Sequence, residues 1–253
     1  MTKAELKEFL DEKAYQYNVF DFIETDPIQI PHRFTKKEDI EIASFLVSMM
    51  AWGKRNIIIN KGTELMQLMD DSPFDFVMNH NKKDLLQFKN FKHRTFISDD
   101  FVFFIQSLQN IYKNHNGLEP LFYINPEEIN PFFAFQRFRK IFFEIPHQYR
   151  SNKHIANTEK NAAAKRLNMF LRWMVRNDKK VDLGIWQSIL PEKLSCPLDV
   201  HSGRMGRALQ LINSKQDNWK TVEELDKNLR KLNPKDPVLY DFALLGIGVY
   251  EKF

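Results

Sequence analysis

Cysteine is nearly absent from this chain of 253 residues, which contains only Cys196. A single thiol excludes an internal disulfide framework and any site built from several thiolates, whether for zinc or for an iron–sulfur cluster. The seven histidines show no HxxxH or HExxH spacing, so we predict no metal site and no cofactor. The phosphate-binding P-loop, the dinucleotide fingerprint and the G-x-S-x-G nucleophile motif are also missing.

Long apolar runs are missing as well. The first residues, Met1-Thr2-Lys3-Ala4-Glu5, lack the hydrophobic region of a signal peptide, and no window approaches 18 apolar residues without a charge. We therefore expect a cytoplasmic protein that does not bind a membrane. The sequence gives no indication of its oligomeric state.

Glycine is scarce, with eight residues, whereas phenylalanine is abundant, with twenty-three. Apolar residues recur over long stretches with a period near 3.6 rather than 2, and a β-rich chain would need more turn residues. We predict an all-α fold. With 43% hydrophobic and 28% charged residues, a chain of this length can bury a large core in one domain or two lobes.

Two stretches hold the candidate functional residues. Asp199 precedes a run in which apolar residues recur at helical spacing, so it occupies the place of an N-cap carboxylate. Upstream, the helix-like run from Asn161 to Arg176 has an apolar stripe of Leu167, Phe170, Leu171 and Met174. Such a stripe predicts that Lys165, Arg172 and Arg176 point away from the core.

The region from Lys160 to Lys180 is strongly basic. It holds seven lysines and arginines against Asp178 alone, within a chain of net charge +4. This local excess of positive charge suits contacts with phosphate groups. A helix face that is simply exposed to solvent explains the charge about equally well.

The residues Leu198-Asp199-Val200-His201, followed by Arg204 and an apolar helix, resemble the catalytic-aspartate segment of the helix-hairpin-helix (HhH-GPD) superfamily of base-excision DNA glycosylases. Lys165 lies where bifunctional members carry a lysine at the start of a helix, and Tyr240–Gly248 resembles the helix that closes the domain. The order of these blocks is similar to that of an uncharacterised bacterial family within the superfamily. The resemblance implies a two-lobed helical fold, here without an iron–sulfur cluster.

On this reading we expect three parts of the chain. Residues 1–34 form an N-terminal helical segment packed on the C-terminal lobe, residues 35–150 form a helical barrel lobe, and residues 151–253 form the lobe with the Lys/Asp motif. Two departures from the usual members accompany the resemblance. The segment Asn157–Ala164 contains no glycine where other members have a glycine-rich hairpin, and the long separation of Lys165 from Asp199 requires the region around Asp182–Leu194 to loop out.

The resemblance implies a DNA glycosylase with AP lyase activity that acts on damaged bases, oxidised purines among them, in double-stranded DNA. Lys165 would form a Schiff base with the sugar and Asp199 would stabilise its positive charge. The other expected roles are support of the pair by His201 and Arg166, DNA binding by Lys160, Arg172, Arg176 and Arg204, and a base pocket near Met50 and Trp52. Two alternatives stay open: a non-catalytic nucleic-acid-binding protein and a helical protein-interaction module.

Overall fold

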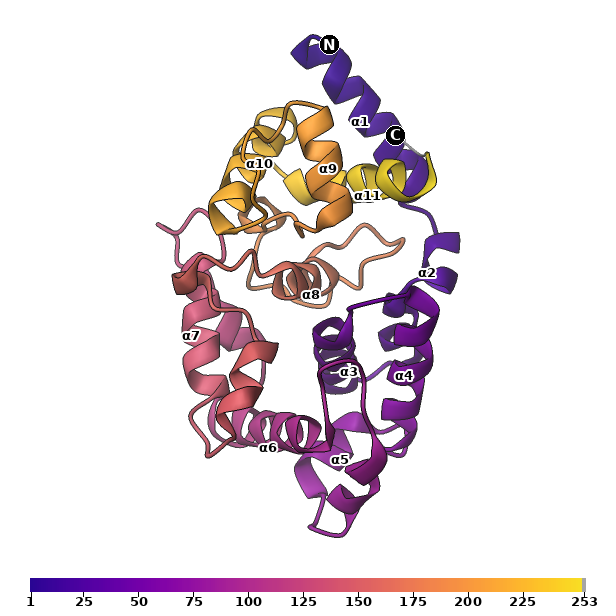
Figure 1. Cartoon of the computed structure of the whole chain (residues 1–253), viewed down its shortest axis with the longest axis vertical. Helices are drawn as coiled ribbons and strands as arrows, with labels where there is room; N and C mark the ends of the chain where they lie inside the picture. Colours follow the sequence, from indigo (N-terminus) through magenta and orange to yellow (C-terminus); the bar gives the residue numbers. More distant parts are fainter. Residues whose placement is uncertain (252–253) are drawn as a thin grey trace. The chain divides into compact units, whose positions relative to one another are not determined.

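The computed structural model describes residues 1–251, and these are folded into helices joined by irregular segments (Figure 1). The prediction of an all-α chain is confirmed, because this part of the chain contains isolated β-bridges but no strand. The α-helices are α1 (Lys3–Tyr17), α2 (Asp21–Thr25), α3 (Lys37–Met50), α4 (Arg55–Gln67), α5 (Pro73–Asn79), α6 (Ser98–Asn114), α7 (Phe132–Phe142), α8 (Lys165–Val175), α9 (Val200–Ala208), α10 (Trp219–Leu232) and α11 (Tyr240–Tyr250).

Short 3-10 helices lie between them. These are η1 (Pro27–Gln29), η2 (Pro31–Arg33), η3 (Asp84–Asn90), η4 (Glu119–Phe122), η5 (Tyr149–His154), η6 (Thr158–Lys160), η7 (Pro191–Lys193) and η8 (Pro237–Leu239). Five of the eight begin at or directly beside a proline, whose fixed φ angle suits the first turn of a helix and whose missing N–H is not needed there.

The chain divides into two compact units. Unit 1 contains residues 1–22, 124–133 and those from 156 onward, and unit 2 contains residues 23–123 and 134–155. The expected lobe 35–150 differs from unit 2 at residues 23–34, at residues 124–133 and at residues 151–155, which also belong to unit 2. Residues 23–34 belong to unit 2, because η1 and η2 pack against α3 and Asp26 pairs with Arg55 at 3.8 Å.

Residues 124–133 belong to unit 1 rather than to unit 2. The ammonium group of Lys193 donates to the carbonyl oxygens of Pro126 and Glu128 at 2.9 and 2.7 Å. The ring of Phe132 lies 5.4 Å from that of Trp219. These contacts join residues that are far apart in the sequence, so periodicity alone did not reveal them.

The core of unit 2 is built from phenylalanine rings around α3, which is buried from Ile40 to Met50. The ring of Phe45 lies 5.5 Å from Phe138, 5.6 Å from Phe142 and 6.0 Å from Phe104. The Phe45–Phe138 pair is edge-to-face and the Phe45–Phe142 pair is tilted, and aromatic quadrupoles favour such geometries over a face-to-face sandwich. The abundance of phenylalanine noted in the sequence therefore serves packing.

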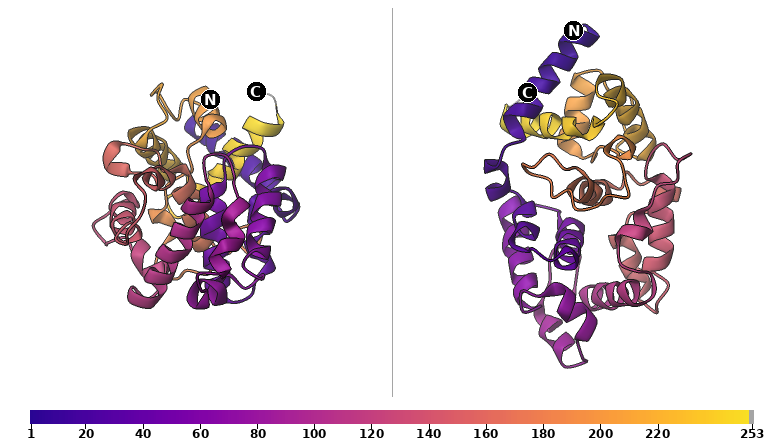
Figure 2. Two further views of the ribbon diagram at one scale, coloured as in Figure 1. Left: turned by 60° about the horizontal axis from the view of Figure 1, so that its bottom comes forward. Right: turned by 180° about the vertical axis from the view of Figure 1, so that it is seen from behind.

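In unit 1, α1 packs against α11, and Figures 1 and 2 show the C-terminal part of α1 beside that helix in views from opposite sides. The rings of Tyr17 and Tyr250 stack at 5.7 Å, and the ammonium group of Lys13 lies 2.7 Å from the carboxylate of Glu251. The two helices approach closely at Gly246, where a Cβ atom would lie only 2.1 Å from the Tyr17 ring. The N-terminal helix is thus packed on the C-terminal helix.

The helices of residues 1–251 include none that combines the length and the apolar character needed to cross a bilayer. The four helices of unit 1 that follow residue 156 are α8, α9, α10 and α11, and of these α9 packs against α11. Lys165 of the predicted Lys/Asp pair is the first residue of α8, and Asp199 directly precedes α9.

Candidate functional site

The segment before α8 sets the point at which the helix begins. Asn161 and Ala164 both adopt left-handed backbone conformations, with φ of 61° and 51°. A right-handed helix cannot pass through such residues, so α8 starts at Lys165. The sequence pattern had suggested an earlier start, at Asn161. Asn161 also accepts the backbone N–H groups of Trp219 and Lys220 through its carbonyl and side-chain oxygens, at 3.1 and 3.2 Å. The segment is thereby tied to the start of α10.

Lys165 is consequently the first residue of α8. The predicted apolar stripe of this helix is confirmed, since Leu167, Phe170, Leu171 and Met174 are all buried. The first N–H groups of a helix have no partner within the helix, and no side chain caps α8. The ammonium group of Lys165 therefore stands where the backbone itself is electropositive.

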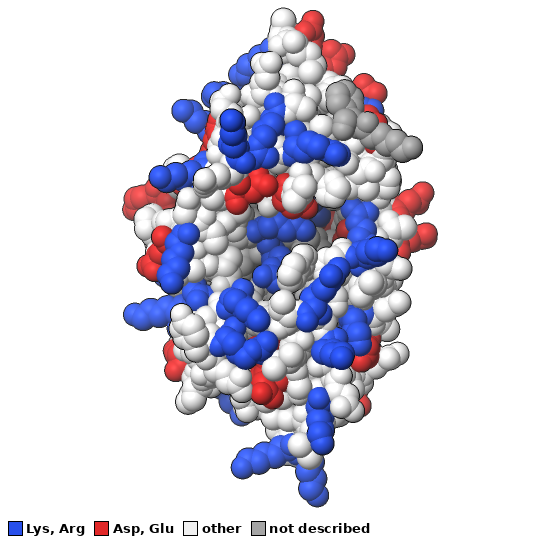
Figure 3. Space-filling model, viewed as in Figure 1, with Lys and Arg blue, Asp and Glu red and all other residues white. Residues whose placement is uncertain are grey.

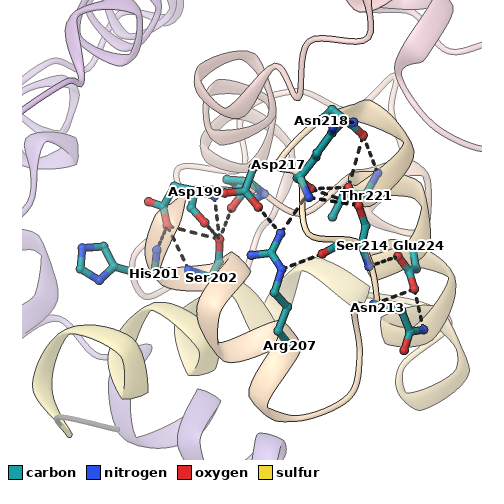
Figure 4. A network of polar contacts seen from close by, with 12 residues as sticks. Asp199, His201, Ser202, Arg207, Asn213, Ser214, Asp217, Asn218, Thr221 and Glu224 are labelled. Atoms are coloured by element: carbon teal, nitrogen blue, oxygen red, sulfur yellow. Dashed lines mark hydrogen bonds and ion pairs between the residues drawn. The ribbon is translucent and has the colours of Figure 1, made fainter.

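Asp199 is the N-cap of α9, as predicted. One oxygen of its carboxylate accepts the backbone N–H groups of His201 and Ser202 at 2.8 and 3.0 Å. In return, the Ser202 hydroxyl accepts the N–H of Asp199 at 2.8 Å, which completes a capping box. Figure 4 shows this carboxylate turned toward the first turn of α9. The reciprocal bonds fix the orientation of the Asp199 side chain.

The second oxygen of Asp199 faces Lys165, with Oδ2 and Nζ 3.6 Å apart. Between α8 and α9 the chain runs through residues 176–199, which are irregular except for η7. This agrees with the loop expected around Asp182–Leu194. The side chain of Lys165 is 32% exposed and that of Asp199 is 26% exposed. The structure therefore brings together, at a partly open position, the two residues chosen from the sequence as catalytic candidates.

The electrostatic surroundings keep Asp199 ionised. Burial alone would raise the pKa of this carboxyl, but the charge of Lys165 and the N–H groups of Ser202 and His201 outweigh burial and lower the pKa below its ordinary value. At neutral pH the site therefore presents an ionised carboxylate beside Lys165.

His201 and Arg204 both contact α11. The Nδ1 atom of His201 lies 3.3 Å from the carbonyl oxygen of Gly248, and the guanidinium group of Arg204 donates to the same oxygen at 2.7 Å. Both residues remain largely exposed at the surface. Through these contacts they hold the first turns of α9 against α11, and with them the cap at Asp199.

Arg172 and Arg176 contradict the expectation that they face solvent and bind DNA. Their side chains are only 3% and 2% exposed. Arg172 pairs with Asp182 and Asp241, while Arg176 pairs with Asp178, Asp182 and Asp236. A buried guanidinium group needs such carboxylates to compensate its lost hydration. These two arginines are structural, and their charges are not available to phosphates.

Lys160 and Arg166 have different surroundings. Lys160 is exposed at the end of η6 and stays a candidate for DNA contact. Arg166 follows Lys165 on α8 and is only partly exposed, and burial lowers the pKa of its guanidinium group.

The base-pocket candidates belong to unit 2. The Met50 side chain is buried in the core at the end of α3, so it does not present a surface to a base. Trp52, by contrast, is 57% exposed, and the guanidinium carbon of Arg94 lies 5.8 Å from the centre of its ring. The Nε2 atom of His93 lies 3.0 Å from the carbonyl oxygen of Met50, the last residue of α3, and this contact holds the end of α3 directly before Trp52. Only Trp52 of the two has an accessible side chain.

Sequence reasoning missed Asp241, the buried carboxylate of α11 that accepts a hydrogen bond from Arg172. A charged residue within the apolar run Tyr240–Gly248 was a signal that a buried partner existed. Among residues 1–251, no three histidine, cysteine, aspartate or glutamate side chains come together in a way that could hold a metal ion.

Comparison with curated proteins finds no match, and comparison with solved structures finds none either. One protein family does match, and its profile covers residues 26–250, which include α8, Asp199 and α11 but leave out α1. The chain therefore belongs to DUF2400, a family described as "Protein of unknown function".

Proposed function

We propose that unit 1 carries the active site of a DNA glycosylase with AP lyase activity, with Lys165 as the nucleophile and Asp199 as the charge-stabilising carboxylate. The observation that carries the proposal is the 3.6 Å approach of these two side chains, which come from distant parts of the sequence. They also occupy the positions that the HhH-GPD resemblance assigns to a catalytic pair. The proposal includes a two-lobed fold of that superfamily, without an iron–sulfur cluster, acting in the cytoplasm.

The first step of such a reaction breaks the bond between the sugar C1′ atom and the damaged base. Positive charge develops on the sugar as the base leaves, and a fixed carboxylate close to C1′ lowers the energy of that state. Asp199 suits this role because its capping bonds hold it in place and because its pKa is lowered. A preorganised charge of this kind needs no rearrangement during the reaction.

The lyase step requires Lys165 without its proton. The neutral amine attacks C1′, the N-glycosidic electrons leave with the base, and the nitrogen then loses a proton as the sugar ring opens to a Schiff base. Removal of a proton from C2′ expels the 3′-phosphate by β-elimination, and water releases the lysine. The partial exposure of the Lys165 side chain leaves its Nζ atom within reach of a sugar.

Several features support DNA as the partner. Lys160 and Arg204 are exposed, and the uncapped start of α8 presents N–H groups of the kind that hold phosphates in proteins. Figure 3 shows many lysine and arginine side chains on the viewed face, with acidic side chains among them. Within unit 2, Trp52 is exposed beside Arg94 and stays the candidate for stacking on a base.

A trapping experiment tests the proposal. Duplexes with an abasic site or an oxidised purine are incubated with the protein and borohydride, which reduces a Schiff base to a stable covalent complex. We expect the wild type to be trapped and Lys165→Ala not to be trapped. Lys160→Ala, which removes only a candidate DNA contact, should be trapped once its concentration is raised to compensate for weaker binding. Asp199→Asn should trap poorly on intact lesions because base excision slows.

Two outcomes would replace the proposal with its alternatives. Salt-dependent binding of DNA without trapping on any lesion would indicate a non-catalytic nucleic-acid-binding protein. Absence of DNA binding even at low salt would favour a helical protein-interaction module.

A further inference from the structure

Arg207 ties the loop between α9 and α10, residues 209–218, to α9. It precedes the last residue of α9, and its Nε atom donates to the carbonyl oxygen of Ser214 at 2.7 Å. Its Nη2 atom donates to the carbonyl oxygen of Gln216 at 3.2 Å and to the carboxylate of Asp217 at 2.6 Å. Figure 4 shows this side chain reaching from α9 to Ser214 and Asp217. The guanidinium group thus fixes the second half of the loop relative to α9.

Gly203 allows this tie to lie against the helix. A Cβ atom at Gly203 would be 2.9 Å from Nη1 of Arg207 and 2.9 Å from the carboxylate of Asp217, so the ion pair occupies the space that a side chain would take. The N–H of Gly203 donates to the carbonyl oxygen of Asp199 at 2.7 Å. The ion pair therefore packs one helical turn beyond Asp199, on the helix that Asp199 caps.

The start of α10 connects the same loop to Lys165. Asn218, which follows Asp217, is the N-cap of α10 and pairs with Ala162 in an isolated β-bridge. Asn161 accepts the next two backbone N–H groups of α10, at 3.1 and 3.2 Å. The segment that holds Asn161 and Ala162 leads directly into α8, whose first residue is Lys165. The loop is therefore attached at one end to the helix of Asp199 and at the other to the segment before Lys165.

We propose that Arg207 is a positioning residue for the Lys165–Asp199 pair: by tying α9 to this loop, it holds the carboxylate of Asp199 at its distance from the Lys165 amine. Its importance for catalysis rests on the proposed function, whereas its effect on the geometry does not. Without the guanidinium group, the first turns of α9 stay attached to α11 through His201 and Arg204. The other end of α9 becomes free to move, so the pair spends less time in contact.

Glu224 provides a matched control. Its carboxylate accepts the backbone and side-chain N–H groups of Asn213, both at 2.8 Å, and the backbone N–H of Ser214 at 3.3 Å. These bonds join the loop to α10, to which Glu224 belongs, and not to α9. Glu224→Ala therefore removes as many hydrogen bonds from the same loop as Arg207→Ala does, but it leaves the tie between the loop and α9 in place.

Carbodiimide cross-linking measures the geometry without DNA. The reagent activates a carboxylate as an O-acylisourea, and an adjacent amine displaces the urea to form an amide. Mass spectrometry gives the yield of the Lys165–Asp199 cross-link relative to that of Lys13–Glu251, a pair at 2.7 Å between α1 and the C-cap of α11. Both pairs belong to unit 1, so general loosening of this unit lowers both yields and leaves their ratio unchanged.

We expect the cross-link ratio of Arg207→Ala to fall about fivefold, because hydrogen bonds that hold α9 in place are lost. Glu224→Ala should keep the wild-type ratio. Arg207→Lys retains a positive charge and a donor for the loop, so it should recover part of the loss. An unchanged ratio in Arg207→Ala, or equal falls in Arg207→Ala and Glu224→Ala, would overturn the inference.

Gly203→Ala tests the same tie without removing any polar group. The added methyl group must displace the ends of two flexible side chains, those of Arg207 and Asp217, whereas alanine favours a helix more than glycine does. We therefore expect this variant to fold and to give a ratio between those of the wild type and Arg207→Ala. A wild-type ratio in Gly203→Ala would contradict the proposal, even where Arg207→Ala fails to fold.

The trapping experiment distinguishes positioning from DNA binding. At saturating DNA, Arg207→Ala should be trapped about tenfold more slowly than the wild type. The DNA concentration that gives half the maximal rate should stay the same, because the guanidinium group binds the loop. Arg207→Lys should regain part of the rate. A raised DNA requirement at an unchanged maximal rate would make Arg207 a DNA contact and overturn the inference.

The cross-linking result and the trapping result can fail separately. A lowered cross-link ratio in Arg207→Ala, without a trapped complex from any chain, removes the enzymatic proposal and leaves the role of Arg207 intact. Trapping of wild type and Arg207→Ala at equal rates, with an unchanged ratio, does the reverse.

Discussion

Arg176 and Asp182 form an ion pair in which both side chains are almost completely buried. Arg176 follows the end of α8, and Asp182 lies six residues later on the irregular segment that leads to Asp199. Burial alone would lower the pKa of Arg176, but Asp182, Asp236 and Asp178 outweigh it and raise the pKa, so the guanidinium group stays charged. This pair anchors the turn that returns the chain toward Lys165.

Replacement of Arg176 by alanine should destabilise the protein strongly. The change leaves Asp182 without one of its two arginines in a buried position, and loss of one partner from a buried pair costs about 3–5 kcal/mol of the free energy of unfolding. Urea denaturation measures this loss. Arg204→Ala, at an exposed position, serves as the control and should cost less than about 1 kcal/mol. Equal effects of the two variants would show that the buried pairs do not anchor this turn.

Gly246→Ala should disturb the contact between α1 and α11. The added methyl group would overlap the Tyr17 ring, and overpacking of this kind costs about 1–3 kcal/mol. In a Tyr17→Ala background the ring is absent, so the same glycine substitution should cost much less. The four unfolding free energies form a double-mutant cycle. Additive losses would indicate that the glycine is required for another reason.

Asp226→Asn should alter the dependence of stability on pH. Because burial raises the pKa of Asp226 from 3.8 to about 6, the folded chain binds this proton more tightly than the unfolded chain does. The resulting stabilisation is present below the unfolded pKa and is lost as pH rises through about 6. It amounts to about 3 kcal/mol at most. The unfolding free energy of the variant relative to wild type should thus increase by about 3 kcal/mol between pH 3 and pH 7; a constant difference would contradict the assignment.

Two substitutions of Asp199 separate its role as the N-cap of α9 from the role of its negative charge. Asp199→Ala removes the N-cap and should cost about 1 kcal/mol of the free energy of unfolding, whereas asparagine caps helices nearly as well as aspartate. Thermal unfolding of both variants tests this difference. An Asp199→Asn chain that is as unstable as Asp199→Ala would mean that the charge, not the capping bonds, stabilises the start of α9.

Much of the local structure could be predicted from the sequence. The all-α character, the apolar stripe of α8 and the N-cap at Asp199 all follow from spacing and from residue types that act over a single turn. The proximity of Lys165 and Asp199 was a different kind of prediction. It came from resemblance, because no local pattern relates two residues joined by a long irregular segment.

The surroundings of Arg172 and Arg176 could not be predicted in this way. Their positions on the helix period favoured solvent, but the carboxylates of Asp236 and Asp241 reach them from a distant part of the chain. Charge pairing across long sequence separations leaves no periodic signal. The start of α8 was misplaced for a related reason, since the left-handed conformation of Ala164 is imposed by its context and not by an intrinsic preference of alanine.

The only cysteine of the chain, Cys196, contacts two buried carboxylates, Asp226 through its backbone N–H and Asp241 through its thiol. Its thiol is fully buried and stays protonated, so alkylating reagents can modify it only when the surrounding helices separate. In the wild-type protein, the rate at which Cys196 is alkylated therefore reports how often unit 1 opens. A cysteine engineered at an exposed position can meanwhile receive a fluorophore selectively.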